Sequence, residues 1–391
     1  MVPPASRLGK IPPYLFGEIA RAKAKALAEG QDLIDFGIGD PDQPTPAPII
    51  EALARAARDP ATHRYDESDA GWPPFLESVA RWYGRRFGVE LDPASEILLL
   101  IGSKEGLAHL AWAYIDPGDL SLVPDPAYTV YKMNTLLAGG DVHVMPLRAE
   151  NGFLPRLEEI PAATADRAKL LYLNYPNNPT GATASLEFFS EVVQFARRHD
   201  LIVCHDCAYS EVYFDGYRPP SFLQAPGAKE VGIEIHSVSK TFNMTGWRVG
   251  FAVGNPEVLR ALNWMKSNID SKQFPAVDMA AAYALDTWTE DRETLRLYQR
   301  RRDILVNGLN RLGFDVPPPK ATFYLWVPVR PGYTSAEFAK LLLEQAGILV
   351  APGNGYGRHG EGYVRMALTV SGDKNGERIE EAVDRLATAL S

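Results

Sequence analysis

The chain has 391 residues, of which 46% are hydrophobic and 23% charged, as in globular proteins and unlike disordered or fibrous ones. Its net charge of −9, with no local basic stripe, argues against a nucleic-acid partner. No apolar run approaches the roughly 18 residues of a membrane span, residues 1–10 lack a secretory signal, and two cysteines cannot form a disulfide framework. We therefore expect a cytoplasmic protein of two domains without a membrane partner.

The first 41 residues predict an arm, a helix and a short strand. Prolines interrupt the start of the chain, and helical spacing then runs over residues 13–29. Leu15, Phe16 and Ile19 require burial, so we expect the arm to dock on a partner subunit, with a frayed arm as the alternative. A strand over residues 32–36 leads into a loop rich in turn residues.

From residue 46 to about 250, helical stretches alternate with short, almost wholly apolar runs. This alternation predicts a doubly wound α/β domain whose parallel sheet is covered on both faces. We expect helices near residues 48–58, 74–87, 104–115, 127–138 and 185–198. We expect strands at residues 97–101, 120–123, 142–145, 170–173, 201–204, 233–236 and 249–253.

The last third of the chain predicts a smaller α+β unit. Helices are expected from residue 256 to 312, near 335–345 and from 376 onward, with strands at 324–327, 348–350 and 363–368. We therefore divide the chain into a large domain, residues 41–295, and a small domain built from both ends, residues 1–40 and 296–391.

A Cys-x-x-Cys pair at residues 204–207 could suggest a redox or zinc site, but two cysteines cannot fill a structural zinc site, and we predict no metal. Asp206 is the more informative residue, because it ends a buried strand, where ligands bind in open α/β sheets. A carboxylate there needs a cationic partner. An ordinary ion pair or a turn residue is the alternative.

Three further motifs follow or precede strands. Residues 355–360 match G-x-G-x-x-G, but a strand follows them, so we interpret them as a flexible loop and not as a dinucleotide fingerprint.

Ser103 and Lys104 open a helix, where N–H groups can hold phosphate or where Ser is merely a cap. Lys240 follows a buried strand; it is either a solvated loop residue or a desolvated amine able to form a Schiff base.

The separate signals converge along one sheet. Asn178 lies in a tight turn after a strand, Asp206 and Lys240 follow two further strands, and Arg248 comes eight residues later. Carbonyl chemistry on a lysine, a carboxylate and several phosphate ligands in one cleft describe pyridoxal phosphate.

These motifs resemble the class I/II aminotransferases of pyridoxal-phosphate fold type I. The carrying stretches are Asn-Asn-Pro-Thr-Gly at 177–181, Asp-Cys-Ala-Tyr at 206–209 and Ser-Val-Ser-Lys at 237–240 with Arg248. Residues 36–42, 102–106 and 266–271 are most similar to LL-diaminopimelate aminotransferases and their aspartate and alanine relatives. The resemblance covers residues 35 to about 365 and implies an α/β fold with a mostly parallel central sheet, a small α+β domain and a homodimer.

The resemblance also implies roles for individual residues. Lys240, Asp206 and Tyr209 are the implied catalytic residues: Lys240 carries the cofactor as a Schiff base, Asp206 bonds the pyridine nitrogen, and Tyr209 holds the phenolic oxygen together with Asn178. The further implied cofactor contacts are Ser103, Lys104, Tyr128, Ser237, Arg248 and, from the neighbouring subunit, Tyr65.

The implied reaction moves an amino group from an L-amino acid to a 2-oxo acid. Arg365 is implied to clamp the substrate α-carboxylate, aided by Asn178 and the backbone of Gly39. An acidic substrate needs a second cation; Lys104 is our first candidate, and the weaker ones are Lys272 and Arg64. We expect LL-diaminopimelate or aspartate as donor, with 2-oxoglutarate and glutamate as the acceptor pair, in lysine biosynthesis.

Two positions depart from the family pattern. Gly71 comes six residues after Tyr65, where relatives often have five, and Lys272 stands where diaminopimelate enzymes often have glycine. Two alternative functions stay open: a β C–S lyase of the same fold and cofactor, and a non-catalytic regulatory domain that binds ligand without turnover. The presence of Lys240, Asp206 and Tyr209 disfavours the regulatory domain.

Overall fold

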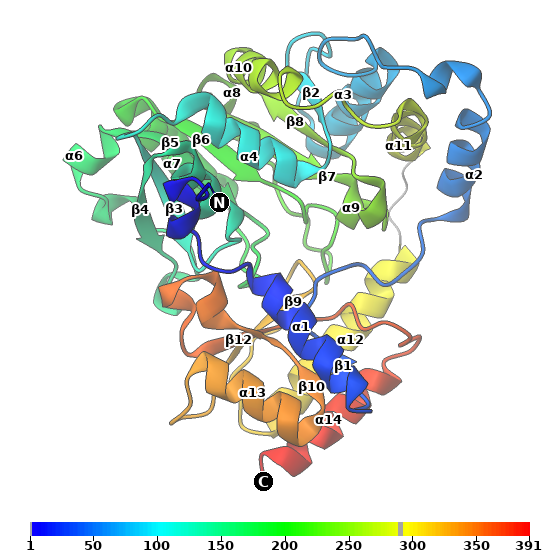
Figure 1. Cartoon of the computed structure of the whole chain (residues 1–391), viewed down its shortest axis with the longest axis vertical. Helices are drawn as coiled ribbons and strands as arrows, with labels where there is room; N and C mark the ends of the chain where they lie inside the picture. Colours follow the sequence, from blue (N-terminus) through cyan, green and yellow to red (C-terminus); the bar gives the residue numbers. More distant parts are fainter. Residues whose placement is uncertain (1, 288–291) are drawn as a thin grey trace.

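The computed structural model describes residues 2–287 and 292–391. Figure 1 shows two stacked bodies, of which the lower combines the blue start of the chain with its yellow-to-red end. Every helix within these residues is too short or too polar to cross a bilayer. The domain limits after residues 40 and 295 stay predictions.

The upper body is built on a seven-stranded sheet. Its strands, in spatial order, are β2 (Ile97–Leu100), β8 (Gly250–Gly254), β7 (Gly232–Ser237), β6 (Ile202–Asp206), β5 (Ala168–Asn174), β3 (Leu120–Asp125) and β4 (Asp141–Pro146). The five strands from β7 to β4 run parallel, whereas β8 is antiparallel to both of its neighbours. The mostly parallel central sheet predicted from the sequence is therefore confirmed.

Helices cover both faces of this sheet because its strands are apolar on both sides. In β2, for example, Leu98 and Leu100 join one core, and Ile97 and Leu99 join the other. The first core also receives α4 (Ser103–Tyr114), α5 (Val130–Ala138) and α10 (Pro256–Ser267). The second receives α2 (Ala47–Ala56), α3 (Pro73–Phe87), α7 (Leu186–His199), α8 (Ala228–Val231) and α11 (Pro275–Thr287).

Two one-turn helices complete the upper body: α6 (Ala162–Ala165) before β5 and α9 (Val238–Thr241) after β7. Lys240, in α9, and Arg248 both lie in the connection between β7 and β8.

The lower body contains two small sheets. The strands β11 (Ala351–Pro352), β12 (Tyr363–Ala367) and β9 (Tyr324–Pro328) are antiparallel, and β1 (Ile34–Asp35) pairs in parallel with β10 (Ile348–Leu349). The surrounding helices are α12 (Arg292–Arg311), α13 (Ser335–Ala346), α14 (Glu377–Ala389) and α1 (Leu15–Ala28). Helix α1 packs Leu15 and Ile19 against Trp326 and Leu349, which joins the two ends of the chain in one body.

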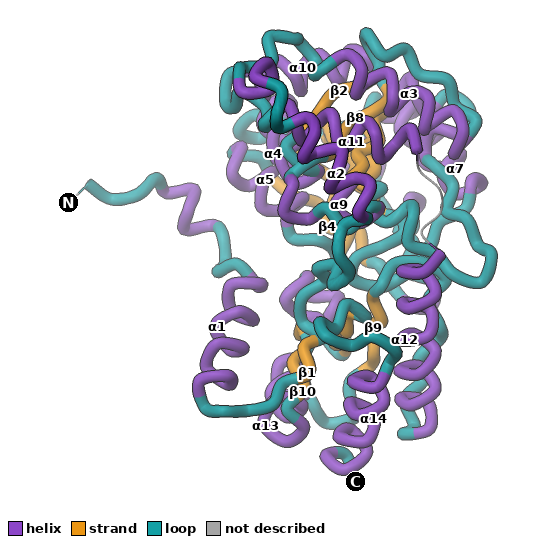
Figure 2. Tube along the Cα trace, turned by 90° about the vertical axis from the view of Figure 1, so that its right-hand side faces the viewer, coloured by secondary structure: helices purple, strands orange, loops and turns teal. Residues whose placement is uncertain are grey.

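Three local expectations need correction or remain untested. Helix α5 starts at Val130 and not at residue 127; the N–H of Ala127 donates to the carbonyl of Tyr356 in the turn before it. The interpretation of residues 355–360 as a flexible loop was wrong: they lie in two 3-10 helices that bury Tyr356. The arm before α1 projects from the molecule in Figure 2, and its docking on a partner stays a prediction.

Candidate active site

A cavity of about 370 Å³ lies at the carboxyl ends of β5, β6 and β7, where side chains of both bodies meet. Ligands bind at this edge in open α/β sheets. The cavity is lined by Gly39, Ser103, Lys104, Tyr128, Asn178, Asp206, Tyr209, Ser237, Lys240, Arg248 and Arg365, all of which were singled out in the sequence. The sequence-predicted cofactor residue outside it is Tyr65, whose side chain is 82% exposed on the surface.

Asp206 presents one free oxygen to this cavity. Its Oδ2 accepts a hydrogen bond from the hydroxyl of Tyr131 at 2.7 Å, whereas Oδ1 has no partner among the described residues. Burial raises the pKa of Asp206, and the bond from Tyr131 opposes that shift. A buried acceptor without a donor is costly, so Oδ1 is suited to receive a donor from a ligand.

Asn174, which the sequence analysis missed, ties two of the predicted residues together. It ends β5 directly opposite Asp206 in the sheet. Its Nδ2 donates to the carbonyl of Asp206 at 2.7 Å, and its Oδ1 accepts from the N–H of Asn178 at 2.8 Å. The signal available in the sequence was its position at a strand end beside the strand of Asp206.

The amine of Lys240, a half-buried residue, lies beside the backbone of Gly39. Its Nζ donates to the carbonyl of Gly39 at 3.0 Å. Burial lowers the pKa of Lys240 to about 8, and the charges of Arg365 and Arg248 act in the same direction, against Asp40. A lowered pKa leaves a substantial share of neutral, nucleophilic amine near neutral pH. Residue 39 must be glycine, because a Cβ there would overlap the hydroxyl of a neighbouring tyrosine.

An anion cradle lies on the other side of Lys240. Helix α4 begins at Ser103, and Gly102 before it has a φ of 78° and packs against the guanidinium of Arg248. Arg248 Nη1 donates to the carbonyl of Thr245 at 2.6 Å, and Ser237 lines the same wall. A helix N-terminus, a guanidinium and hydroxyl groups together suit a phosphate.

Arg365 is a fully buried cation without a carboxylate partner among the described residues. Its Nη1 donates to Asn178 Oδ1 at 2.9 Å and its Nη2 to the carbonyl of Gly37 at 2.8 Å, while Nε has no partner. Three rings surround the guanidinium carbon at 4.2, 5.1 and 5.5 Å: Tyr324, Tyr356 and Phe16. An anionic ligand group would supply the missing counter-charge. The sequence analysis did not assign these rings, because residues 16, 324 and 356 meet only through the fold.

Lys104 is the sequence-predicted distal cation that lines the cavity. Its Nζ lies 3.3 Å from the hydroxyl of Tyr14 and 4.6 Å from the centre of that ring. Lys272 instead reaches the carbonyls of Asp66 and Ser68, away from the lining residues. Arg64 is also outside the lining, so any contact of these two with a substrate depends on a partner chain.

The residues present fit the expected pyridoxal phosphate. Oδ1 of Asp206 can receive the ring N–H, the amine of Lys240 can react with the aldehyde, and the cradle around Arg248 can hold the phosphate. Tyr128 and Tyr209 line the cavity between these points, and the Tyr209 hydroxyl lies 3.0 Å from that of Tyr324.

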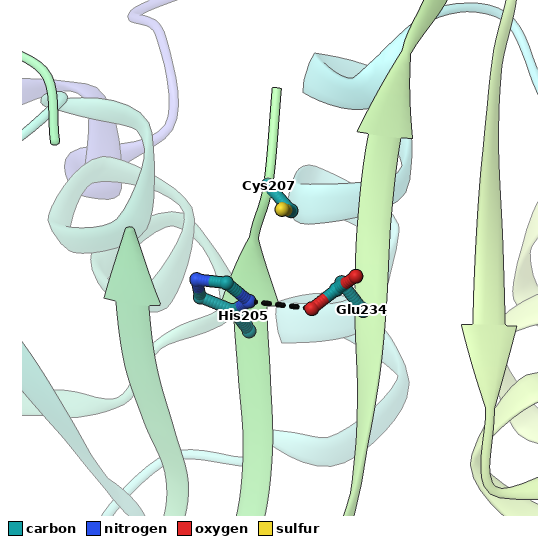
Figure 3. Close-up of side chains that lie close together, drawn as sticks. All are labelled: His205, Cys207 and Glu234. Carbon is teal, nitrogen blue, oxygen red and sulfur yellow. Dashed lines mark hydrogen bonds and ion pairs between the residues drawn. The ribbon is translucent and has the colours of Figure 1, made fainter. Parts of the chain in front are cut away.

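The opposite face of β6 and β7 carries a separate polar cluster, shown in Figure 3, that includes His205, Cys207 and Glu234. Glu234 Oε2 accepts from His205 Nδ1 at 2.7 Å and from the N–H of Phe222 at 2.7 Å. Its Oε1 accepts from a tyrosine hydroxyl at 2.6 Å and a second histidine at 2.7 Å. Burial alone would raise the pKa of Glu234, but the histidine hydrogen bonds hold it low. Both oxygens are thus fully used within the core.

The chain matches known proteins over almost its whole length. The model of the family "Aminotransferase class I and II" matches residues 31–386. LL-diaminopimelate aminotransferase of Moorella thermoacetica is 57% identical over 387 residues, covering 99% of this chain and 98% of the relative. The enzyme of that name in Syntrophobacter fumaroxidans is 58% identical over 386 residues, covering 98% and 97%. Substrate-bound BacF of Bacillus subtilis is a similar solved structure, with 38% identity, a TM-score of 0.94 and coverage of 99% and 98%.

Proposed function

The chain belongs to the class I and II aminotransferases, and we propose that it moves the amino group of LL-diaminopimelate to 2-oxoglutarate. Its cofactor is pyridoxal phosphate, which supplies an aldehyde for the amino group and a ring that withdraws electrons from the substrate α-carbon. The observation that carries the substrate proposal is the layout of one cavity: Lys240 lies in it with a buried, unpaired Arg365 and an exposed Lys104.

Asp206 and the cradle around Arg248 hold the cofactor in this proposal. Oδ1 of Asp206 would accept from the ring nitrogen, and Tyr131 keeps the other oxygen occupied so that the carboxylate has one orientation. Ser103, Ser237 and Arg248 would hold the phosphate. Tyr128 would lie against the ring, and Tyr209 would act with Asn178 at the phenolic oxygen.

Lys240 attaches the cofactor and also moves the proton. When its amine is free, Nζ of Lys240 would accept a proton from the substrate α-carbon and hold it for return. A pKa lowered to about 8 suits a group that must both accept and donate a proton near neutral pH. The carbonyl of Gly39, 3.0 Å away, orients the amine.

Arg365 binds the α-carboxylate of each substrate. Its bonds to Asn178 and Gly37 fix the plane of the guanidinium, and the free Nε offers a further donor. Because Arg365 lacks a carboxylate partner in the described chain, a substrate carboxylate restores charge balance in a buried site.

Lys104 accounts for the preference for an acidic substrate. LL-diaminopimelate carries a second carboxylate, and burying it without a cation would be unfavourable. The exposed ammonium of Lys104, held by the ring and hydroxyl of Tyr14, is the cation at that end of the cavity.

We place the enzyme in the cytoplasm as a homodimer. Support for the homodimer comes from exposed apolar side chains on residues 63–69 and 263–274, namely Tyr65, Trp264, Ile269 and Phe274. These two segments touch through Asn263 and Asp69 and through His63 and Phe274. An exposed apolar patch of this kind is typical of an interface, and Tyr65 within it would reach the cofactor phosphate of the second copy.

A panel of amino donors with 2-oxoglutarate tests the function. We expect LL-diaminopimelate to give the highest kcat/KM, with glutamate as product, and alanine to be poor. If the protein released pyruvate and ammonia from cystathionine faster than it transaminated LL-diaminopimelate, it would be a β C–S lyase. Absence of amino-group exchange with every donor in the cofactor-bound protein would identify a regulatory domain.

A further inference from the structure

Lys272 adopts an unusual backbone conformation in the loop between α10 and α11. Its φ is 64°, in the left-handed region that disfavours residues with a Cβ. Such a conformation persists only where the surroundings hold it. The N–H of Lys272 donates to Asp270 Oδ1 at 3.0 Å, and its side chain turns inward.

The ammonium group of Lys272 is enclosed by oxygens of another segment. Nζ donates to the carbonyl of Asp66 at 3.2 Å and to that of Ser68, and lies 3.4 Å from Asp66 Oδ2. The side chains of Lys272 and Asp66 are only 12% and 9% exposed. Asp66 in turn accepts from the N–H and hydroxyl of Ser68 at 3.0 and 2.7 Å. The ammonium therefore links oxygens of Asp66 and Ser68 and holds the turn formed by residues 66–68.

This turn lies next to Tyr65. The other end of the same segment is held to β2, where the N–H of Leu99 donates to the carbonyl of Ala70 at 2.8 Å. Asp66 follows Tyr65 immediately, so its anchored carbonyl fixes the backbone that carries the exposed ring. The two departures from the family pattern, a segment one residue longer and a lysine in place of glycine, thus contact each other.

Lys272 supplies the positive charge that faces the Asp66 carboxylate. Burial raises the pKa of Asp278 to about 8, and the negative charge of Asp66 adds to that shift. Lys266 is already paired with Asp270 at 2.7 Å and with Glu105 at 3.4 Å. Without Lys272, the buried carboxylate of Asp66 would lose its paired cation, and the turn would have to open to hydrate it.

We propose that Lys272 is a positioning residue for Tyr65, which fixes residues 66–68 by its ammonium group so that the Tyr65 ring is preset to reach the cofactor phosphate of a second copy. This inference rests on the proposed function, which supplies the dimer and the role of Tyr65. It assigns the lysine to cofactor retention and not to substrate recognition.

A double-mutant cycle tests the inference. Pyridoxal phosphate is titrated into the stripped dimer of the wild type, Tyr65→Phe, Lys272→Met and the double variant, and its dissociation constant is measured. Loss of one charge-assisted hydrogen bond is worth roughly 10- to 150-fold. We expect each single variant to bind the cofactor at least about tenfold more weakly, and the double variant to bind no more than about twofold more weakly than Tyr65→Phe.

Three further variants serve as controls. Lys229 also binds a carboxylate and a carbonyl, those of Glu96 and Glu90, but far from the cavity, so Lys229→Met should bind the cofactor normally. Lys272→Arg should recover most of the affinity. Lys272→Gly removes the ammonium while suiting the left-handed backbone, and it replaces Lys272→Met in the cycle if the methionine variant does not fold.

The outcomes separate this inference from the function on which it rests. The role of Lys272 is overturned if the losses of cofactor affinity in the two single variants multiply in the double variant. It is also overturned if Lys272→Met and Lys272→Gly bind the cofactor as tightly as the wild type. Neither outcome contradicts the role of Tyr65. Wild-type affinity in Tyr65→Phe overturns the assigned role of Tyr65 and the inference with it. Transamination of LL-diaminopimelate by the wild type is measured separately and is untouched by either result.

Discussion

Adjacent residues of one strand, His205 and Asp206, face two very different polar regions. Behind the sheet, Glu234 accepts two hydrogen bonds on each oxygen, and the cluster around His205 is complete in itself. In front of the sheet, Asp206 Oδ1 lacks a donor and Arg365 lacks a counter-ion among the described residues. Folded proteins rarely leave buried polar groups unpaired. The incomplete side is therefore where a ligand belongs, and the complete side supports the fold.

The largest effect should come from Lys240, the reactive group on the incomplete side. Lys240→Ala removes both the attachment point and the proton carrier, so transamination should fall by at least about 10⁴-fold. The melting temperature should change little. Borohydride reduction followed by mass spectrometry should find no covalently held cofactor. Lys229→Met is the matched control and should react normally; substantial activity in Lys240→Ala would contradict the assignment.

A paired substitution compares the two faces of the strand directly. Asp206→Asn weakens the stabilisation of a protonated ring nitrogen, so kcat should fall about 10²- to 10³-fold with little loss of stability. Glu234→Gln disrupts the complete cluster and should lower the free energy of unfolding by about 3–5 kcal/mol, with the smaller loss in kcat. Urea unfolding and steady-state kinetics on both variants measure the contrast. If Asp206→Asn lost mainly stability, Asp206 would be a structural residue.

Lys104 sharpens the comparison at the outer end of the cavity. Lys104→Met should raise KM for LL-diaminopimelate by roughly 10- to 150-fold, the value of one charge-assisted hydrogen bond. KM for a neutral amino acid should change much less, because that substrate has no second carboxylate. Steady-state kinetics with LL-diaminopimelate and with a neutral amino acid measure the two changes in KM. Equal effects would mean that Lys104 acts through the cofactor.

Asp278 tests the limits of the comparison. It is buried, and its Oδ2 has no hydrogen-bond partner in the part of the chain that the structure describes, although Asp278 lies outside the cavity. Burial raises its pKa from 3.8 to about 8, so between these values the folded chain holds a proton that the unfolded chain releases. Its contribution to stability is therefore present at low pH and is lost as pH rises toward 8.

Asp278→Asn cannot ionise and should escape this loss. The measured quantity is the free energy of unfolding of Asp278→Asn minus that of the wild type. From pH 5 to pH 8 this difference should grow by at least about 1.4 kcal/mol, the value of one pKa unit. Urea unfolding at the two pH values measures the difference. An advantage that does not change with pH would show that Asp278 is ionised in the folded protein.

The parts that were predictable from sequence share a physical reason. Asp206, Lys240 and Asn178 follow strands of a parallel sheet, and the carboxyl ends of such strands meet at one edge. That argument and the family motifs predict that they line one cavity, as they do; their roles stay proposals. It also predicted the mostly parallel order of strands but not the antiparallel direction of β8, which depends on the path of the link after Lys240.

The residues that were missed depend on contacts between distant segments. Tyr14 and Tyr324 line the cavity, and Tyr356 lies 5.1 Å from the Arg365 guanidinium carbon, only because the fold brings both chain ends together. No local pattern encodes that meeting. Tyr131 was missed for another reason: it lies on a helix whose spacing indicates an ordinary core residue, and its hydroxyl finds Asp206 across the sheet edge.

The parallel pairing of β1 with β10 sets an order of events during synthesis. It joins Ile34 to Ile348 and thereby brings the carbonyl of Gly37 to Arg365, across 328 residues of chain. On the ribosome, the strands next to Asp206 and Lys240 emerge well before the end of the chain, but the contact between Gly37 and Arg365 cannot form before the final strands leave the exit tunnel. A nascent chain therefore contains Asp206 and Lys240 well before it can join Gly37 to Arg365, and translation that stops short of β10 leaves that contact unmade.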